Sequence, residues 1–120
     1  MVKQPQNILE ELRNSIREFV QEREWDKFHT PKNLAVSLSV EAAELLEHFQ
    51  WLRTGDKAEL GVAKVDHIKA EMADVLIYLI RLADKLDVDL AGAVHSKLEV
   101  NRMKYPAEKV RGSAKKYDEY

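Results

Sequence analysis

Apolar residues recur every three or four positions along most of this chain, and no segment alternates apolar and polar residues as a strand would. The four glycines and three prolines fall at or near the ends of the periodic segments. With 120 residues, 45% hydrophobic and 33% charged, the chain has the size and composition of one globular domain. The sequence therefore predicts an all-α fold, packed as a four-helix bundle.

Start and stop signals divide the periodic pattern into four helices. They are a helix over residues 6–24, a helix from Pro31 that ends at Gly55, a helix from an Asp66 cap to Leu86, and a helix from an Asp89 cap that ends near Tyr105 and Pro106. Thr30 supplies an N-cap hydroxyl before Pro31, which suits the first helical position. Residues 54–65 have no clean period and are expected to form the longest loop.

The third helix is apolar on more than one side, because Ile77 and Ile80 lie off its main apolar line. One small chain rarely encloses a helix so fully, so we expect a homo-oligomer, a homodimer or homotetramer, with this helix near the interface. The domain is expected to span residues 1–106, and residues 107–120 to form a polar, basic and mobile tail.

Composition excludes several classes of protein. The chain has no cysteine, which excludes disulfide scaffolds, thiolate metal sites and cysteine nucleophiles. Its 19 basic and 21 acidic residues give a net charge of −2, which argues against a nucleic-acid partner. No apolar run approaches the roughly 18 residues of a membrane span, and the first residues lack a signal peptide. We therefore expect a cytoplasmic protein with no membrane partner.

A glutamate in the middle of an apolar helical face is the most informative feature. The apolar side chains of the second helix cluster within an arc of about 60°: Leu34, Leu38, Leu45, Phe49 and Leu52. Glu41 falls inside this arc, and Glu44 lies about 60° to one side of it. Burying a carboxylate without a partner costs several kcal/mol, so something must compensate the charge of Glu41.

The third helix repeats the arrangement, with Glu71 and Asp74 three residues apart and Tyr78 one turn further on the same side. As antiparallel neighbours, the second and third helices would bring the two acid pairs together. Two carboxylates about 5 Å apart repel by roughly 3 kcal/mol at an effective dielectric of about 20, so four either take up protons or bind a cation. With no cysteine or histidine in register, the oxygen ligands favour Mg²⁺, with Mn²⁺ as a substitute, the usual ion for substrate phosphates.

Two alternatives to a magnesium site remain open. In the first, lysines or arginines pair with the acids inside a helical interaction module that has no catalytic activity. In the second, the chain is a metal-binding bundle of another chemistry, such as a di-iron protein. Di-iron bundles use Glu-x-x-His, and none of the four histidines has a glutamate three residues before it.

These residues resemble the MazG-like all-α nucleoside triphosphate pyrophosphohydrolases, whose pattern is two acid pairs on consecutive helices. The pairs are Glu41-x-x-Glu44 and Glu71-x-x-Asp74. Three further segments resemble the dCTP pyrophosphatase branch of the family: REWDKFHTPKNLA (23–35), EAAELLEHFQW (41–51) and NRMKYP (101–106). The resemblance covers about residues 15–106.

The resemblance implies Mg²⁺-dependent hydrolysis of a nucleoside triphosphate, dCTP or a modified dCTP, to the monophosphate and pyrophosphate, in nucleotide-pool sanitation. It implies that Glu41, Glu44, Glu71 and Asp74 hold the metal, and that Glu41 or Glu44 also positions or deprotonates the attacking water. The residues that it implies in substrate binding are Trp25, His29, Trp51 and Tyr78 at the base, and Asn101, Lys104 and Tyr105 elsewhere. Taken alone, His29 near a helix start would be expected to bond a backbone group.

Overall fold

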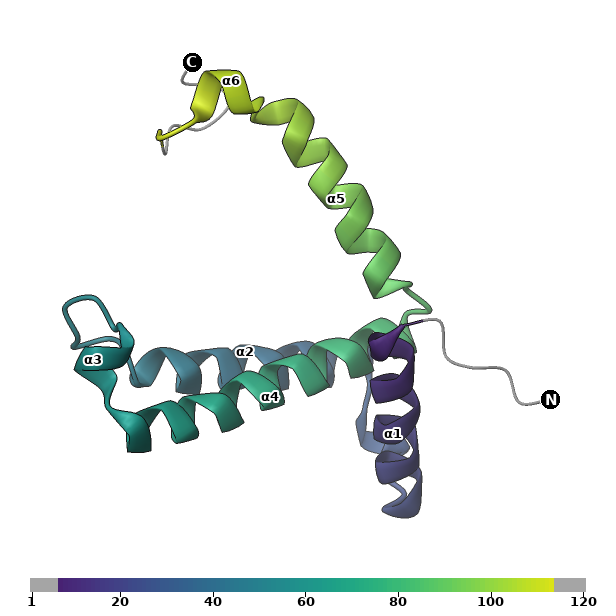
Figure 1. Cartoon of the computed structure of the whole chain (residues 1–120). Helices are drawn as coiled ribbons and strands as arrows, with labels where there is room; N and C mark the ends of the chain where they lie inside the picture. Colours follow the sequence, from purple (N-terminus) through teal and green to yellow (C-terminus); the bar gives the residue numbers. More distant parts are fainter. Residues whose placement is uncertain (1–6, 114–120) are drawn as a thin grey trace. The chain divides into compact units, whose positions relative to one another are not determined.

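A computed structural model describes residues 7–113, and they contain no strand, so the all-α prediction is confirmed (Figure 1). The elements in chain order are α1 (Ile8–Glu22), the 3₁₀ turn η1 (Asp26–Phe28), α2 (Pro31–Glu47), α3 (Lys57–Leu60), α4 (Val62–Lys85), α5 (Leu90–Lys104) and α6 (Ala107–Val110). The chain divides into two compact units, residues 1–88 and residues 89–120. No helix in the described range is long and apolar enough to cross a membrane.

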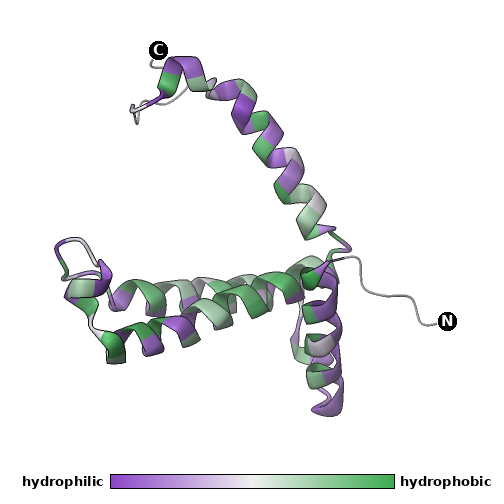
Figure 2. Cartoon of the chain, viewed as in Figure 1, coloured by the Kyte–Doolittle hydropathy of each residue, from purple (hydrophilic) through white to green (hydrophobic). Residues whose placement is uncertain are grey.

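In the first unit, α2 and α4 run antiparallel side by side, as predicted, and α1 packs against one end of α4 (Figure 1). The buried apolar side chains come from all three helices: Val20 of α1, Leu34 of α2, and Ile68, Ile80 and Ala83 of α4. Hydrophobic residues line α2 and α4 along much of their length (Figure 2). The α2–α4 pair is therefore the scaffold on which the predicted acids are mounted.

Two of the predicted helix caps are confirmed. The Thr30 hydroxyl accepts a hydrogen bond from the Asn33 backbone N–H at 3.1 Å, directly before Pro31. The Asp89 carboxylate accepts one from the Gly92 backbone N–H, also at 3.1 Å. These caps satisfy N–H groups that the first turn of a helix leaves without partners. The prediction that Asp66 caps a helix is wrong, because α4 begins at Val62, one turn earlier.

The early start of α4 follows from Gly61. This residue has a φ of 78°, a left-handed value that a glycine adopts without strain, and it lies between α3 and α4. The chain can therefore change direction there and begin α4 at once, which leaves Asp66 inside the helix. Part of the predicted loop over residues 54–65 is accordingly helical.

The segment after α2 is organised by one carboxylate. α2 ends at Glu47 rather than just before Gly55, and the chain then turns. The Glu59 carboxylate accepts hydrogen bonds from the backbone N–H groups of Arg53, Thr54 and Gly55 at 2.8–2.9 Å. These N–H groups point at Glu59 and not at carbonyls one turn back, so the carboxylate holds the turn over residues 53–55. The three bonds lower the pKa of Glu59 to about 2.

The second unit contains α5 and α6. α5 ends at Lys104, before Tyr105 and Pro106, as predicted. Residues 107–110 form the short helix α6 inside the predicted tail, whose mobility stays a prediction; residues 114–120 lie outside the described range. The single domain over residues 1–106, and a bundle completed by α5, stay predictions.

We predict that Glu59→Gln lowers the melting temperature at neutral pH, because the neutral amide holds the three N–H groups less strongly. The pKa of Glu59 is lowered in the folded chain, so its contribution is present above the unfolded pKa of about 4.5 and lost as the pH falls towards 2. Thermal melts should therefore show a gap between wild type and variant that closes in acid. Glu18→Gln, at an exposed position of α1, is the control; a gap that does not depend on pH would contradict the assignment.

Candidate metal centre and adjoining pocket

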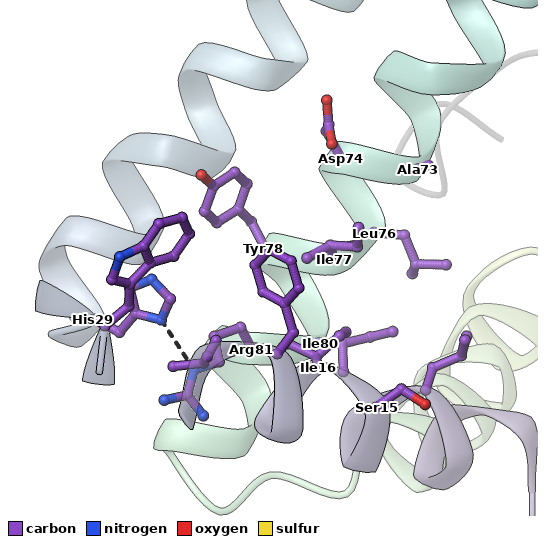
Figure 3. Close-up of a pocket in the computed structure, with 14 residues that line it drawn as sticks. Ser15, Ile16, His29, Ala73, Asp74, Leu76, Ile77, Tyr78, Ile80 and Arg81 are labelled. Carbon is purple, nitrogen blue, oxygen red and sulfur yellow. Dashed lines mark hydrogen bonds between the residues drawn. The ribbon is translucent and has the colours of Figure 1, made fainter. Parts of the chain in front are cut away.

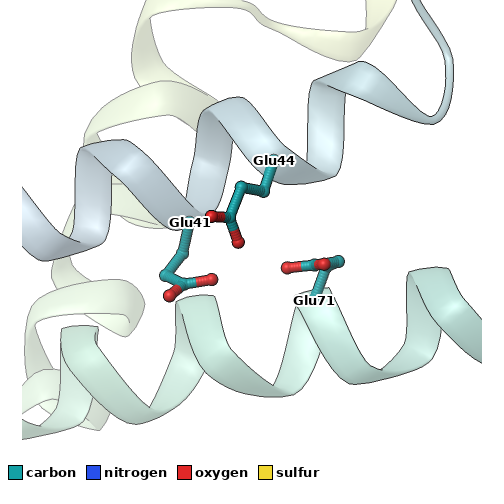
Figure 4. A group of neighbouring side chains, drawn as sticks. All are labelled: Glu41, Glu44 and Glu71. Atoms are coloured by element: carbon teal, nitrogen blue, oxygen red, sulfur yellow. The ribbon is translucent and has the colours of Figure 1, made fainter.

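Three of the four predicted metal ligands converge between α2 and α4. Glu41 and Glu44, three residues apart on α2, and Glu71 of α4 project towards one another (Figure 4). One carboxylate oxygen from each lies within 4.8 Å of the other two, and all three side chains are half-buried. A spacing of three places Glu41 and Glu44 on the helix face that meets α4. The antiparallel packing therefore assembles a cluster of three carboxylates, which we call the glutamate cluster.

Asp74, the fourth predicted ligand, lies at the edge of this arrangement. It is on α4, three residues after Glu71, and is exposed rather than part of the glutamate cluster. Its charge is nevertheless close enough to raise the pKa of Glu41. Asp74 is therefore a neighbour of the glutamate cluster and not a member of it.

The glutamate cluster gathers acidic groups that no lysine or arginine of residues 7–113 pairs with. Burial, a hydrogen bond with Glu44, and the charges of Glu44, Asp74 and Glu71 raise the pKa of Glu41 to about 7. The buried Oε2 atoms of Glu41 and Glu71 have no hydrogen-bond partner in the described part of the chain. Buried oxygens without partners are costly and rare, and a divalent cation would satisfy both of these. The residues present therefore fit a metal ion.

The hypothesis of internally paired acids finds no support in residues 7–113. No lysine or arginine of this range forms an ion pair with Glu41, Glu44 or Glu71. The arginines that do pair in this unit bind other acids, so an interaction module stabilised by such pairs does not account for the glutamate cluster.

Histidines lie beside the cluster, but the group of side chains close enough to share one ion consists of the three glutamates alone, in the described part of the chain. His48 Nε2 lies 3.9 Å from Glu71 Oε1, and the His48 ring stacks on that of His67 at 6.4 Å between centroids. The sequence held a signal for this: His48 follows Glu44 by four residues, and His67 precedes Glu71 by four. Nitrogen donors are thus available at one end of the cluster, although its core consists of oxygens.

A cavity of about 690 Å³ lies along α4 next to Asp74, walled by α1, the segment around η1 and α4 (Figure 3). Three predicted substrate residues line it: Trp25, His29 and Tyr78. Its remaining lining is mostly apolar, with Phe19 packed edge to face on Trp25 at 5.7 Å between ring centroids. An apolar cavity of this size with a few polar groups is typical of small-molecule sites.

The other predicted substrate residues belong to other parts of the chain. Trp51 lies in the turn after α2, is 88% exposed and does not line the cavity. Asn101, Lys104 and Tyr105 lie together at the end of α5, in the second unit. Roles for these four residues stay predictions.

Arg81 is a functional candidate that the sequence analysis did not identify. It is only 6% exposed and also lines the cavity. Its guanidinium donates to Asp26 at 2.6 Å, Asp84 at 3.3 Å and His29 Nδ1 at 3.1 Å. The expectation that His29 bonds a backbone group is therefore wrong. The available signal was an arginine within the apolar run VLIYLIRLA, a position that requires buried partners.

Comparison with known proteins gives one consistent result. The MazG-like family model matches residues 36–120. dCTP pyrophosphatase 1 of Homo sapiens is 43% identical over 117 residues, which are 96% of this chain and 69% of that protein. The same-named protein of Rattus norvegicus is 42% identical, over 94% of this chain and 68% of its own length. The crystal structure of a pyrophosphatase from Archaeoglobus fulgidus superposes with a TM-score of 0.73 at 44% identity, over 88% of this chain and 99% of that one.

With divalent ions removed by a chelator, we predict that the protein loses stability as the pH rises from about 4.5 to about 7. The pKa of Glu41 is raised in the folded chain, so its protonated form favours folding at low pH and this contribution disappears as Glu41 ionises. Glu41→Gln should flatten the dependence and raise the melting temperature at pH above 7. Thermal melts across this range, with Glu47→Gln on the same helix as control, test it; a Glu41→Gln profile equal to wild type would contradict the assignment.

Proposed function

Because the chain belongs to the MazG-like family, we propose that it is a nucleoside triphosphate pyrophosphohydrolase that converts dCTP, or a modified dCTP, to the monophosphate and pyrophosphate. The main support is the glutamate cluster, which lacks a lysine or arginine partner in the described residues and adjoins a cavity with aromatic walls. The proposed role is sanitation of the cytoplasmic nucleotide pool.

The proposed metal ligands are Glu41, Glu44 and Glu71 of the glutamate cluster, with Asp74 approaching from the cavity edge. Carboxylate oxygens suit Mg²⁺, and Mn²⁺ accepts the same donors. When bound, the ion would neutralise negative charge on the phosphate oxygens during hydrolysis. The two Oε2 atoms without partners support this assignment, because ligation would satisfy them.

The chain's own residues would position the water that attacks phosphorus. Glu41 and Glu44 project from α2 into the cluster, where a carboxylate oxygen can accept a hydrogen bond from that water and then its proton. As the water oxygen bonds to the α- or the β-phosphorus, the bond from that phosphorus to the oxygen bridging the two breaks. The leaving group keeps the bonding electrons on that oxygen, and it is pyrophosphate for attack at the α-phosphorus or the monophosphate for attack at the β-phosphorus. Both glutamates are suited to this role by position.

The cavity would hold the base. Asp74 lines it and also acts on Glu41, so a nucleotide with its base in the cavity would direct its phosphates towards the glutamate cluster. Trp25 and Tyr78 offer ring faces against which a base can stack. We further propose that Trp51, Asn101, Lys104 and Tyr105 contact the substrate, with Lys104 as the phosphate partner, on the basis of the family pattern alone.

We predict pyrophosphate release from dCTP that requires Mg²⁺ and ceases with a chelator. Glu41→Gln and Asp74→Asn should each lower kcat/KM by about 100-fold or more, because each removes a charged ligand. A panel of deoxynucleoside and ribonucleoside triphosphates with a pyrophosphate assay measures this, and Glu47→Gln, an exposed neighbour on α2, should remain active. Full activity in both site variants would refute the ligand assignment, and activity that follows bound iron would favour another metal chemistry.

We propose that the chain assembles as a homodimer or homotetramer with α4 near the interface. Apolar side chains on α4 remain exposed within the first unit: Met72 is 58% exposed and Ile77 43%, although Ile77 also lines the cavity and Ile80 is buried. Exposed apolar side chains grouped on one helix are typical of an association surface.

Sedimentation at micromolar concentration should therefore give a mass of at least twice 13.9 kDa. Met72→Glu places a charge on the proposed surface and should shift the protein to smaller species. Lys69→Glu, an exposed charge change on the same helix, controls for the charge itself. A 13.9 kDa monomer for wild type would refute the proposal.

A further inference from the structure

Arg81 is held from several sides in the wall of the cavity. Its guanidinium donates to Asp26 from Nη2 and to Asp84 from Nη1. Asp84 is in turn bound by Arg17 of α1, and Asp26 by Lys85. This network joins α1, η1 and α4 and fixes the plane of the guanidinium. The remaining donor, Nε, is directed at the ring of His29 at 3.1 Å (Figure 3).

The hydrogen bond between Arg81 and His29 determines where the histidine carries its proton. A guanidinium has donors only, so the His29 Nδ1 atom must accept and cannot itself bear hydrogen. In the neutral ring the single proton is then on Nε2. Burial and the nearby positive charge of Arg81 lower the pKa of His29. The negative charge of Asp26 raises this pKa and the positive charge of Lys85 lowers it, and the net shift is downward. The neutral ring with its proton on Nε2 is therefore the favoured state.

The protonated nitrogen is available to a ligand. The two nitrogens of an imidazole point in divergent directions, so Nε2 is turned away from the guanidinium. Within residues 7–113, Nε2 of His29 has no hydrogen-bond partner, and His29 lines the cavity together with Trp25 and Tyr78. A hydrogen-bond donor on a mostly apolar wall favours ligands that present a hydrogen-bond acceptor at that point, because other ligands would leave the donor without a partner.

We propose that Arg81 is a positioning residue that holds His29 as a neutral Nε2–H donor, so that this wall recognises a hydrogen-bond acceptor of the base. The proposal rests on the proposed function. A pyrimidine carbonyl oxygen or an unprotonated ring nitrogen meets this requirement, and an exocyclic amino group does not. Cytosine offers both acceptors, at O2 and at N3.

The first experiment tests the tautomer in the nucleotide-free, full-length protein. Nitrogen-15 NMR of histidine-labelled protein at neutral pH should show an unprotonated Nδ1 and a protonated Nε2 for His29, with its signals assigned by their loss in His29→Gln. Arg81→Met should abolish this preference, and Lys85→Met, which removes a cation from the same network without touching His29, should preserve it. An Nδ1–H tautomer or an imidazolium in wild type overturns the proposal, even if Arg81→Met fails to fold.

The second experiment tests recognition. Arg81→Met should raise KM for the preferred nucleotide about tenfold with kcat little changed, the loss expected for one hydrogen bond that is made equally in ground and transition states. Lys85→Met should leave KM unchanged. In a His29→Ala background, Arg81→Met should have no further effect on KM. Equal KM values for wild type and Arg81→Met overturn the inference while the proposed function stands. A wild type with no nucleotide hydrolysis refutes the proposed function, and the NMR result still decides the tautomer.

Discussion

The structure depends on three carboxylates that α2 and α4 force together. Leu34 of α2 and Ile68 of α4 are buried in the first unit, and their burial stabilises the packing of α2 against α4. The same packing removes water from the carboxylates of the glutamate cluster, which is unfavourable. The protein supplies no lysine or arginine to Glu41, Glu44 or Glu71 within the described residues. Binding of a proton or a cation from solution would therefore stabilise the packing of α2 against α4, because it reduces the repulsion between the carboxylates.

Acids elsewhere in the same unit are treated differently. Asp26 and Asp84 are paired with arginine or lysine, and these partners lower the pKa of both carboxyls. The paired acids fix the cavity wall through Arg81, whereas the unpaired glutamates lie ready for a ligand. The distribution of arginine thus separates the structural carboxylates from the candidate metal ligands.

Sequence periodicity was sufficient to predict features that depend on one helix or on adjacent helices. Glu41 within an apolar arc, the Thr30 and Asp89 caps, and the meeting of three of the four predicted acids are of this kind. Features that depend on tertiary contacts were missed. The bond between His29 and Arg81 spans 52 residues, and the turn held by Glu59 requires backbone groups that no side-chain pattern reveals. The start of α4 was misplaced for a local reason, because the left-handed conformation of Gly61 was not foreseen.

A single face of α4 carries Glu71, Asp74, Tyr78 and Arg81, spaced three, four and three residues apart. Any shift or rotation of this helix would displace the acids, the phenol and the guanidinium in concert. The opposite wall, with Trp25 and Phe19, contributes no acid to the glutamate cluster. Substitutions on the α1 side would therefore change the shape of the proposed base pocket and leave the proposed metal ligands in place, which makes this side the freer one for a change of nucleotide preference.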